Sequence, residues 1–513
     1  MKFIKGLFTF LLSLFLWSCQ NTDQQAVEIA KPNIIVFYVD DLGYGDLSCY
    51  GASKVTTPNV DKLAVNGLLL TDAHSTSATC TPSRYSLLTG EYAFRNNAAI
   101  LPGDAPLLIS PDKPTLPKML KKAGYQTAVI GKWHLGLGDG NIDWSGAIKP
   151  GPLEIGFDYS FLLPSTGDRV PSVYLENHYV VGLAPGDSLN VSYKNKIGNR
   201  PTGTANPELL RYKADLQHSN SIINGISRIG FMAGGQSAEW VDEDFPNKFV
   251  SKSRQFINSV DESPFFLFFS FHDIHVPRLP MEQFKGKTEM GVRGDAILQM
   301  DWTVGQIIKI LRDKGLEENT LVIFTSDNGP VINDGYSDES VRKLGDHDPN
   351  GGFSGGKYSA LEAGTRVPTI ISWPGRVNPS ESEALFSQVD IFSSLAAMFG
   401  IALQPGEALD SQDLSGLISG KNKMGRETMI EESETLALRQ GDWKYIRPFN
   451  KDKYPVWIEK TKNIDDGLSN EPQLYNLDDD PSETMNIASS NMDQVLEMEA
   501  MIVAIEKQKT RKR

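Results

Sequence analysis

Unbroken apolar runs are the clearest pattern along the chain, and they predict buried strands. Residues 33–39 form one such run, rich in β-branched side chains, and residues 320–325 form another. Strands that are covered on both faces have this continuous pattern, whereas half-exposed strands alternate apolar and polar positions. Shorter runs predict three further strands, at residues 126–130, 265–270 and 367–372.

Segments with a helical spacing of apolar residues lie between these strands, at residues 59–66, 116–123 and 296–314. Strands that alternate with helices predict an α/β fold, in which a large and mostly parallel sheet is covered by helices on both faces. In such sheets, ligands bind beyond the carboxyl ends of the strands. Polar residues that directly follow a predicted strand are therefore candidates for a functional site.

Two regions depart from this alternation. The stretch from about residue 150 to 235 is rich in Gly, Pro, Asn and Ser, which predicts a long loop excursion. Near residue 422 the character changes again, which predicts a main domain over residues 31–421 and a small α+β subdomain over residues 422–513. The subdomain is expected to contain a hairpin, a third strand and an amphipathic helix, at residues 435–439, 443–447, 473–477 and 492–507.

The first residues of the chain predict export. Residues 1–18 combine two early lysines with an apolar run that is too short to span a membrane. The run ends in Leu-Trp-Ser-Cys, which resembles a bacterial lipobox, so Cys19 is expected to carry a lipid and residues 19–30 to form a tether. Ordinary signal cleavage, with Cys19 as a bystander, is the alternative. We expect a membrane-anchored lipoprotein that faces the periplasm or lies on the outer-membrane surface.

Composition and charge narrow the class of protein. The chain has 513 residues, of which 40% are hydrophobic and 22% charged, and this is typical of a globular protein. Its 50 basic and 64 acidic residues give a net charge of −14, and no nucleic-acid partner is expected, because such partners need an electropositive face. If Cys19 is lipidated, Cys49–Cys80 is the one possible bridge. We expect no disulfide, because the motif around Cys80 indicates another use for that residue.

The segment around Cys80 carries the most specific motif in the chain. It reads C-T-P-S-R-Y-S-L-L-T-G from Cys80 to Gly90. A free cysteine is usually a small buried hydrophobic residue, but that reading does not account for Pro, Arg, Thr and Gly at these positions. The segment closely resembles the signature of the type I sulfatases, which belong to the alkaline-phosphatase-like superfamily. The resemblance implies an α/β/α sandwich, and a maturation enzyme that oxidises Cys80 to Cα-formylglycine.

Three other segments resemble parts of the same family. The sequence G-Y-Q-T-A-V-I-G-K-W-H is similar to the second sulfatase signature and ends with Lys132 and His134, beyond a predicted strand. His275, which precedes Val-Pro, matches the second histidine of the family. Lys357 lies in a G-K-x4-E-A-G-x-R-x-P element, which departs from the family pattern because Ala363 replaces the first of two paired glycines.

Carboxylate and amide side chains follow the two longest predicted strands. Asp40 and Asp41 come directly after one strand, and Asp327 and Asn328 come just after the other. Hard oxygen ligands of this kind suit Ca²⁺ better than Zn²⁺. The resemblance implies that these four residues and the modified Cys80 bind Ca²⁺.

The resemblance also implies a division of roles at the site. The hydrated formylglycine attacks the sulfur atom, while Arg84 and Lys132 hold its hydroxyl groups. Lys357 contacts the sulfate oxygens, and His275 protonates the leaving oxygen. His134 then removes a proton from the second hydroxyl, which regenerates the aldehyde and releases sulfate.

Two other functions are compatible with these motifs. Phosphate and phosphonate monoester hydrolases of the same superfamily can share a C-x-P-x-R nucleophile, and an inactive sulfatase fold could serve as a glycan-binding lipoprotein. The complete set of catalytic residue types favours a sulfatase over both alternatives.

The expected substrate is a sulfated polysaccharide or its oligosaccharides, from algal cell walls or host glycosaminoglycans, as for other bacterial polysaccharide sulfatases. Several loop segments resemble, loosely, those of sulfatases that act on galactose-type sugars. The polar residues that could contact sugar hydroxyls, or could equally be exposed loop residues, are Asp168, Arg169, His178 and His347.

Overall fold

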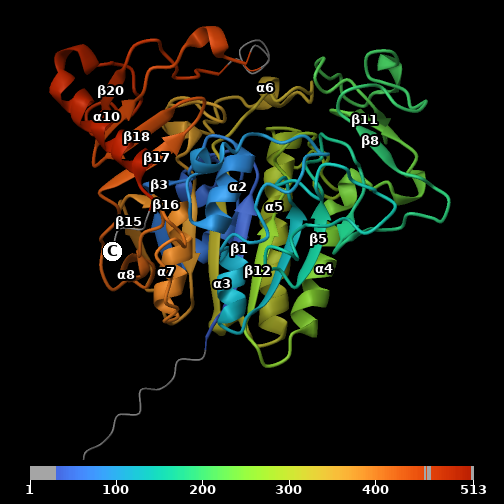
Figure 1. Ribbon diagram of the computed structural model, residues 1–513, viewed down its shortest axis with the longest axis horizontal. Coiled ribbons are helices and arrows are strands. Elements are labelled where there is room, and N and C mark those ends of the chain that lie inside the picture. Colours follow the sequence, from blue (N-terminus) through green and yellow to red (C-terminus); the bar gives the residue numbers. More distant parts are fainter. Residues whose placement is uncertain (1–30, 456–457, 459–463, 510–513) are drawn as a thin grey trace, which may run out of the picture. The chain divides into compact units, whose positions relative to one another are not determined.

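A ten-stranded sheet forms the centre of the protein in the computed structural model, which describes residues 31–455, 458 and 464–509. The five central strands are parallel and lie in the order β13, β1, β12, β4 and β5 (Figure 1). Their bounds are Thr320–Ser326, Asn33–Val39, Phe265–Ser270, Gln126–Lys132 and Tyr159–Leu163. The predicted α/β fold with a mostly parallel sheet is confirmed.

Shorter strands extend the sheet at both edges. At one edge, β14 runs antiparallel to β13, β2 runs antiparallel to β14, and β15 runs parallel to β2. At the other edge, β6 runs antiparallel to β5, and β7 runs antiparallel to β6. These five strands span Thr369–Ser372, Gly67–Leu70, Ser380–Ser382, Leu175–Glu176 and Tyr179–Val180. The strand predicted at residues 367–372 begins only at Thr369, because Pro368 before it has no N–H to donate to a neighbouring strand.

Strand β5 corrects one prediction. It lies within the expected loop excursion, yet it joins the main sheet and pairs along β4 from Ala128 to Lys132. The apolar run of β5 is short and has residues typical of turns on both sides, so its sequence gives little signal. β6 and β7 of the main sheet also lie in this region. Its other strands are short and lie outside the main sheet: β8 to β11, at Asn190–Ser192, Ile222–Ile223, Ile226–Ser227 and Phe231–Ala233.

Helices cover both faces of the sheet, because successive strand residues point to opposite faces. In β1, Ile35 and Phe37 belong to the apolar core beneath α1, α4 and α5, whereas Ile34 and Val36 belong to the core beneath α2, α3 and α7. The helices span Pro58–Val65 (α1), Cys80–Thr89 (α2), Leu116–Lys122 (α3), Phe245–Ser259 (α4), Val292–Asp313 (α5) and Ile391–Met398 (α7). The three predicted helices are confirmed to within a few residues.

A small antiparallel sheet forms the C-terminal part of the protein. Its strands lie in the order β17, β18, β19 and β20, and α10 packs against them through Val495 and Met498. These elements span Thr428–Glu432, Leu436–Gln440, Trp443–Ile446, Gln473–Asn476 and Met492–Lys507. The predicted hairpin, third strand and helix are confirmed. The described residues from Pro32 onward form one compact unit, and a domain boundary at residue 422 stays a prediction.

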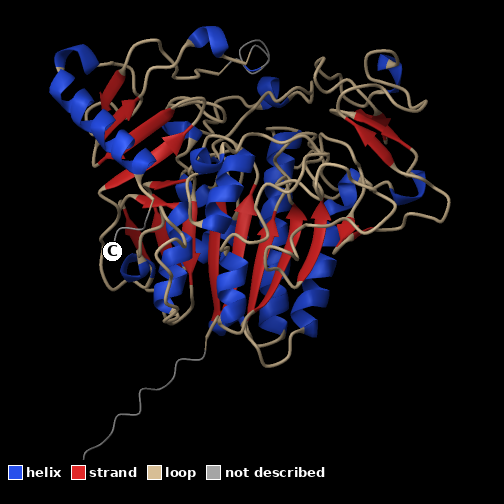
Figure 2. Cartoon of the chain, in the orientation of Figure 1, coloured by secondary structure: helices blue, strands red, loops and turns tan. Residues whose placement is uncertain are grey.

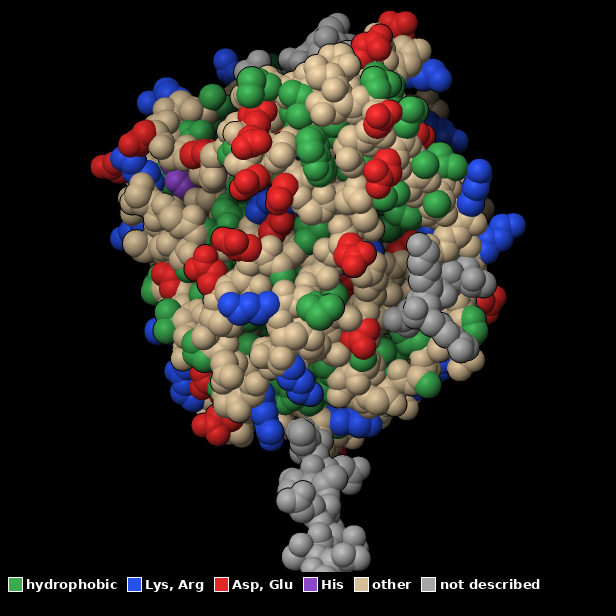
Figure 3. Space-filling model, turned by 90° about the vertical axis from the view of Figure 1, so that its left-hand side faces the viewer, with side chains coloured by type: hydrophobic (Ala, Val, Ile, Leu, Met, Phe, Trp, Pro, Cys, Tyr) green, Lys and Arg blue, Asp and Glu red, His purple; other side chains and the backbone are tan. Residues whose placement is uncertain are grey.

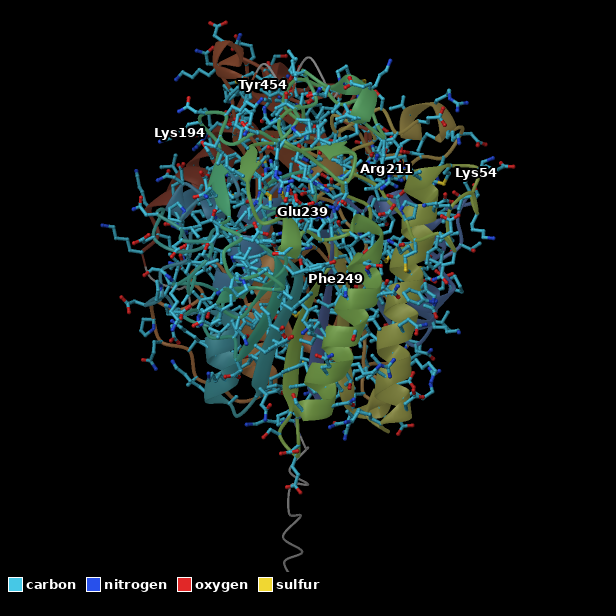
Figure 4. The ribbon with its side chains drawn as sticks, turned by 90° about the vertical axis from the view of Figure 1, so that its right-hand side faces the viewer. Lys54, Lys194, Arg211, Glu239, Phe249 and Tyr454 are labelled. Carbon is cyan, nitrogen blue, oxygen red and sulfur yellow. The ribbon has the colours of Figure 1, made fainter. Side chains whose placement is uncertain are left out.

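The loops that follow the central strands meet at one edge of the sheet. The arrowheads of these strands point toward the upper loops in Figure 2. In Figure 4, Lys194, Arg211 and Tyr454 lie among these upper loops, whereas Phe249 lies lower, where it packs between α4 and the sheet. The residues that follow β1, β4, β12 and β13 are therefore brought together, as expected for a parallel sheet.

Cys49 and Cys80 are free thiols, as predicted. Among the described residues, none of the helices has both the length and the apolar character needed to cross a bilayer. The predicted signal segment, Cys19 and the tether lie outside the described residues.

Candidate active site

Cys80 is the first residue of helix α2 and lies at the carboxyl edge of the sheet. Its side chain is buried, and its Sγ atom lies 3.2 Å from Nδ1 of His134. Pro82 fits the first helical turn, where N–H groups have no partner within the helix. Arg84 lies on the same face as Cys80, because residues four apart are neighbours on a helix. The motif around Cys80 is thus a helix start that brings a thiol and a guanidinium together.

Arg84 is fully buried and joins α2 to the ends of four strands. Its Nε and Nη2 atoms donate to Oδ2 of Asp327 at 3.0 and 2.7 Å. Its Nη1 atom donates to the Ser270 hydroxyl and to the carbonyl of Lys132. The guanidinium also lies 5.2 Å from the centre of the Tyr38 ring. These contacts fix the helix start relative to β13, β12, β4 and β1.

Three buried carboxylates converge beside Cys80. Asp40 and Asp41 follow β1, and Asp327 follows its neighbour β13, so the parallel pairing of the two strands brings them to one edge. One oxygen from each of the three lies within 4.8 Å of the others, and all three side chains are inaccessible to solvent.

Two buried lysines complete the charge balance of this cluster. Lys132, the last residue of β4, places Nζ 2.7 and 2.6 Å from the two oxygens of Asp40. Lys357 places Nζ 2.8 Å from Asp41 and 3.2 Å from Asp334. With Arg84 on Asp327, each of the three central carboxylates has its own cationic partner.

Burial raises the pKa values of Asp40 and Asp327, and their cationic partners lower them, with a different balance in each. Burial opposes ionisation of Asp40, but the Lys132 ammonium and nearby histidines hold its pKa well below the usual range. Burial and the adjacent Asp40 carboxylate raise the pKa of Asp327 to about 6. Asp40 is therefore ionised at neutral pH, whereas Asp327 accepts a proton more readily than Asp40 does.

The oxygen atoms of this cluster fit a hard divalent cation. The amide of Asn328 donates to Asp41 at 2.8 Å, while its Oδ1 atom is buried and has no hydrogen-bond partner within the described residues. A buried acceptor without a partner is costly, and a bound cation would satisfy it. Asp40, Asp41, Asp327 and Asn328 together offer only oxygen donors, which suits Ca²⁺.

Two neutral histidines face the cluster. Nε2 of His134 bonds the carbonyl of Leu101 at 3.0 Å, which leaves Nδ1 as the acceptor toward Cys80. Burial and the Lys132 charge hold the pKa of His134 well below its usual range. Nδ1 of His275 bonds the Val276 carbonyl at 2.7 Å, so Nε2 faces the cluster, and burial lowers the pKa of His275 to about 4.

A cavity of about 280 Å³ opens above these residues. Cys80, His275 and Lys357 lie on its wall together with Asp168 and Arg169, two of the predicted sugar contacts. The remaining lining residues are Ile100, Leu101, Pro102, Tyr193, Gln217, His218, Ile229, Asp334 and Tyr358. The cavity thus joins the predicted catalytic residues to a polar wall.

His218 belongs to that polar wall, and the sequence analysis missed it. Its Nδ1 lies 2.7 Å from Asp215 and its Nε2 lies 3.3 Å from Asp168. Burial disfavours its charged form, but these two carboxylates raise the pKa of His218 above the usual value. The spacing D-x-x-H from Asp215 to His218 was the only signal available. Asp334, also missed, has no distinctive spacing.

Two of the predicted sugar contacts do not line the cavity. His178 lies 3.0 Å from Glu154, and His347 lies 2.8 Å from Asp46, which also binds Arg293. Both histidines are engaged by carboxylates, and neither contacts the other predicted site residues. The structure brings together the predicted catalytic and metal-binding residues but separates these two from them.

Comparison with known proteins agrees with this geometry. The sequence matches the sulfatase family over residues 32–401. It is 49% identical over 479 residues to an N-acetylgalactosamine-6-O-sulfatase of Bacteroides thetaiotaomicron, covering 93% of both chains. It is also 31% identical over 476 residues to human arylsulfatase A, covering 89% of this chain and 83% of the relative.

A solved structure with a similar fold supports the same family. A structure from a study of glycosaminoglycan metabolism by Bacteroides thetaiotaomicron superimposes with a TM-score of 0.90 at 49% identity, covering 93% of this chain and 99% of the other. The family match spans most of the described sheet and all of the clustered residues from Asp40 to Lys357. The chain belongs to the sulfatase family and is a sulfuric ester hydrolase.

Proposed function

We propose that the protein removes 6-O-sulfate from an N-acetylgalactosamine residue, or from a closely related galactose-type sugar, in a sulfated carbohydrate. The observation that carries this proposal is the cavity in which Cys80, His275 and Lys357 face a polar wall formed by Asp168, Arg169 and His218. The sulfatase residues supply a place for the sulfate group, and the polar wall supplies partners for sugar hydroxyls. The 49% identical relative acts on this amino sugar, which supports the choice of substrate.

We also propose that Cys80 is converted to formylglycine and that Ca²⁺ binds at Asp40, Asp41, Asp327 and Asn328. The thiol described above marks the position that the modified side chain would occupy. The aldehyde of formylglycine, once hydrated, supplies a hydroxyl nucleophile, and the cation supplies positive charge that favours its ionised form. The buried, unpartnered Oδ1 of Asn328 supports the cation site.

The remaining residues of the site position the reacting groups. Arg84 and Lys132 place fixed positive charge on either side of residue 80, where negative charge develops during attack. Lys357 lies on the cavity wall and can donate to the sulfate oxygens. His134 lies 3.2 Å from Sγ of Cys80, so it is within reach of a proton on the modified residue.

His275 is proposed to protonate the leaving sugar oxygen. Its Nε2 atom faces the cavity side, because Nδ1 is held by the Val276 carbonyl. Burial and the Lys357 charge keep it neutral in the free enzyme, with a pKa of about 4. A bound sulfate monoester would offset the lysine charge and raise this pKa, so His275 gains its proton as the substrate binds.

The proposal is tested by measuring inorganic sulfate released from defined sugars by protein matured with a formylglycine-generating enzyme. We expect release from N-acetylgalactosamine 6-sulfate and much less from N-acetylglucosamine 6-sulfate, which differs only in the configuration at C4. Sulfated galactose oligosaccharides from algae and phosphate monoesters complete the panel. Release of phosphate rather than sulfate would favour the phosphate or phosphonate monoester hydrolase alternative. Sugar binding without any release would favour a glycan-binding lipoprotein.

We further propose that the protein is exported and anchored through a lipid on Cys19. The support is the sequence alone, an apolar run that ends at a cysteine within a lipobox-like motif. Metabolic labelling with a radioactive fatty acid should mark the wild-type protein but not a Cys19→Ser variant. Equal labelling of both would exclude Cys19 as the anchor.

A further inference from the structure

Asp334 is an acidic residue on the wall of a cavity that must bind an anion. Its side chain is buried, and it lies in the loop between Asn328 and Lys357. Its Oδ2 atom is 3.2 Å from Nζ of Lys357, and both of its oxygens are 3.3 Å from the Tyr358 hydroxyl. Asp334 therefore faces the same cation that is placed to contact the sulfate group.

This carboxylate is not needed to neutralise Lys357. Asp41 already lies 2.8 Å from the lysine, closer than Asp334 does. One oxygen of Asp334 also lies within 4.8 Å of a carboxylate oxygen of Asp41 and a ring nitrogen of His275. A second negative charge at this place weakens the attraction of the site for any anion, and the penalty grows with the charge of that anion.

Charge is what separates the substrate from its closest competitors. A sulfate monoester carries one negative charge. Hydrolysis adds water across the O–S bond, giving the alcohol, inorganic sulfate with two negative charges, and a proton. A phosphate monoester has nearly the same shape but carries close to two charges at neutral pH. Product and competitor therefore each differ from the substrate by about one extra charge.

We propose that Asp334 determines specificity for monoanions, so that the site favours a sulfate ester over inorganic sulfate and over phosphate monoesters. The proposal deepens the proposed sulfatase function and rests on it. Because Asp334 lies 3.2 Å from the lysine that is placed to contact the anion, its charge acts on the anion at short range. At an effective dielectric constant of about 20, such a like charge disfavours each additional negative charge by more than about tenfold in affinity. Asp334 would thus assist product release as well as exclude phosphate esters.

The test measures equilibrium binding of three small anions, methyl sulfate, inorganic sulfate and methyl phosphate, by calorimetry on mature, Ca²⁺-supplied protein. In Asp334→Asn we expect inorganic sulfate to bind at least tenfold more tightly relative to methyl sulfate than in the wild type. Asp334→Glu keeps the charge and should keep the wild-type ratio. Tyr358→Phe removes the hydroxyl contact without changing charge and should also keep it.

The pH dependence of the wild-type protein provides a second readout that needs no variant. Methyl phosphate loses its second proton near pH 6, whereas methyl sulfate stays a monoanion. The affinity ratio of methyl phosphate to methyl sulfate should therefore fall as the pH rises from about 5 to 8.

Two results would overturn the proposal. One is an equal loss of affinity for all three anions in Asp334→Asn, which would mean that Asp334 only holds Lys357 in place. The other is a pH-independent affinity ratio in the wild type. Both results are binding measurements on small anions and do not require hydrolysis of the amino-sugar sulfate. A failure to hydrolyse that sugar would therefore refute the proposed function but would leave the result for Asp334 interpretable.

Discussion

At the scale of single residues, the site is built from pairs that local geometry brings together. Cys80 and Arg84 are four residues apart on one helical face, and Arg84 reaches Asp327 on the neighbouring strand end. Lys132 is the last residue of β4, which is separated from β1 by strand β12, and its side chain reaches Asp40. Arg84 and Lys132 are thus positioned by regular elements and held by ion pairs, which keeps these long side chains ordered.

The role of His275 as a leaving-group acid can be tested with two substrates. A sugar sulfate must expel a basic alkoxide, whereas nitrophenyl sulfate expels a stable phenolate that needs little help from an acid. General acid catalysis contributes about 10²–10⁴-fold, so His275→Ala should cost the sugar sulfate that factor and the nitrophenyl ester much less. The measurement is kcat/KM for both substrates.

Lys132→Ala serves as the control for this comparison. Lys132 lies against the nucleophile side of the site, which both substrates share, so its loss should affect the two esters alike. Equal losses on both substrates for His275→Ala would remove the proposed role. That outcome would point to Lys357 or His272 as the acid.

Residue patterns could predict the site where a family motif or the end of a predicted strand marks it. Asp40, Lys132 and Asp327 lie at the ends of apolar runs that the sequence shows clearly. The α/β pattern predicts that the strands formed by these runs are neighbours in one sheet. Asp334 and His218 instead lie in loops whose mutual contact, a bridge between Ala214 and Tyr336, depends on tertiary structure. No local spacing encodes such a contact, so these residues could not be predicted from the sequence.

The same limit explains why two histidines were predicted as sugar contacts although they do not line the cavity. A polar loop residue can contact a ligand or a neighbouring side chain, and the sequence does not distinguish the two. His178 and His347 are engaged by Glu154 and Asp46. Asp168 and Arg169 line the cavity because the bridge between Arg169 and Ile229 holds their loop beside it.

At the scale of elements, strand β17 of the C-terminal sheet contacts the segment that leads to Cys80. The backbone N–H of Glu432 donates to the Thr76 carbonyl at 3.0 Å, and that of Ala78 donates to the Glu432 carbonyl at 2.8 Å. Ser433 donates to the carbonyl of Tyr358, next to Lys357. The small sheet therefore supports two of the loops that carry catalytic residues.

Glu432 makes this contact dependent on pH. Burial raises the pKa of Glu432 from its ordinary value of 4.5 to about 8, so the folded protein keeps a proton that the unfolded chain loses. Its contribution to stability is full below about pH 4.5 and is lost as the pH rises through 8. Glu432→Gln should therefore be more stable than the wild type at pH 8 by a few kcal/mol and similar near pH 4.5. Chemical denaturation at both pH values measures this difference, and a constant difference would contradict it.

A buried ionic cluster joins the C-terminal sheet to the catalytic loops. Lys444 of β19 lies 3.0, 2.9 and 3.3 Å from oxygens of Glu362, Glu431 and Glu483. Glu362 lies five residues after Lys357, in the same G-K-x4-E sequence motif. Arg439 of β18 also binds Glu362, at 2.5 Å. The two sheets thus meet through charged side chains rather than through apolar packing alone.

Lys444→Met should therefore destabilise the protein strongly. Removal of the lysine leaves the cluster of buried carboxylates with an uncompensated negative charge, which costs about 3–5 kcal/mol of unfolding free energy. Lys309→Met is the matched control, because Lys309 and Asp313 form an exposed pair on α5, and its change should stay within about 0.5 kcal/mol. Denaturant unfolding of both variants measures the contrast. Similar values for the two would show that the cluster does not stabilise the junction.

At the scale of the whole molecule, charges of both signs are mixed over the surface while the site concentrates them. Figure 3 shows acidic and basic side chains interspersed on one face, with acidic groups more frequent in its upper half. The net charge of −14 does not attract an anionic carbohydrate. Attraction of the sulfate group is therefore expected from cationic side chains at the site, such as Lys357 and Arg169 on the cavity wall, which act over a short range.

Metal removal should affect both turnover and global stability. Chelation is expected to abolish most activity, and Ca²⁺ should restore it better than Zn²⁺, because the available donors are oxygens. A ligand that binds only the folded state raises the unfolding free energy by about 2.7 kcal/mol at one hundred times its dissociation constant. The melting temperature should therefore rise with added Ca²⁺. Full activity in exhaustively metal-free protein would exclude the site.

The mass of the peptide that contains residue 80, measured on active protein, tests the account most directly. Conversion of the cysteine to formylglycine replaces a thiol by an aldehyde and makes the peptide about 18 Da lighter. We expect the rate of sulfate release to rise in proportion to the fraction of the protein whose peptide has the lighter mass. Cys80→Ala should be folded but inactive. An active protein whose Cys80 peptide retains the full mass of the unmodified thiol would contradict the account.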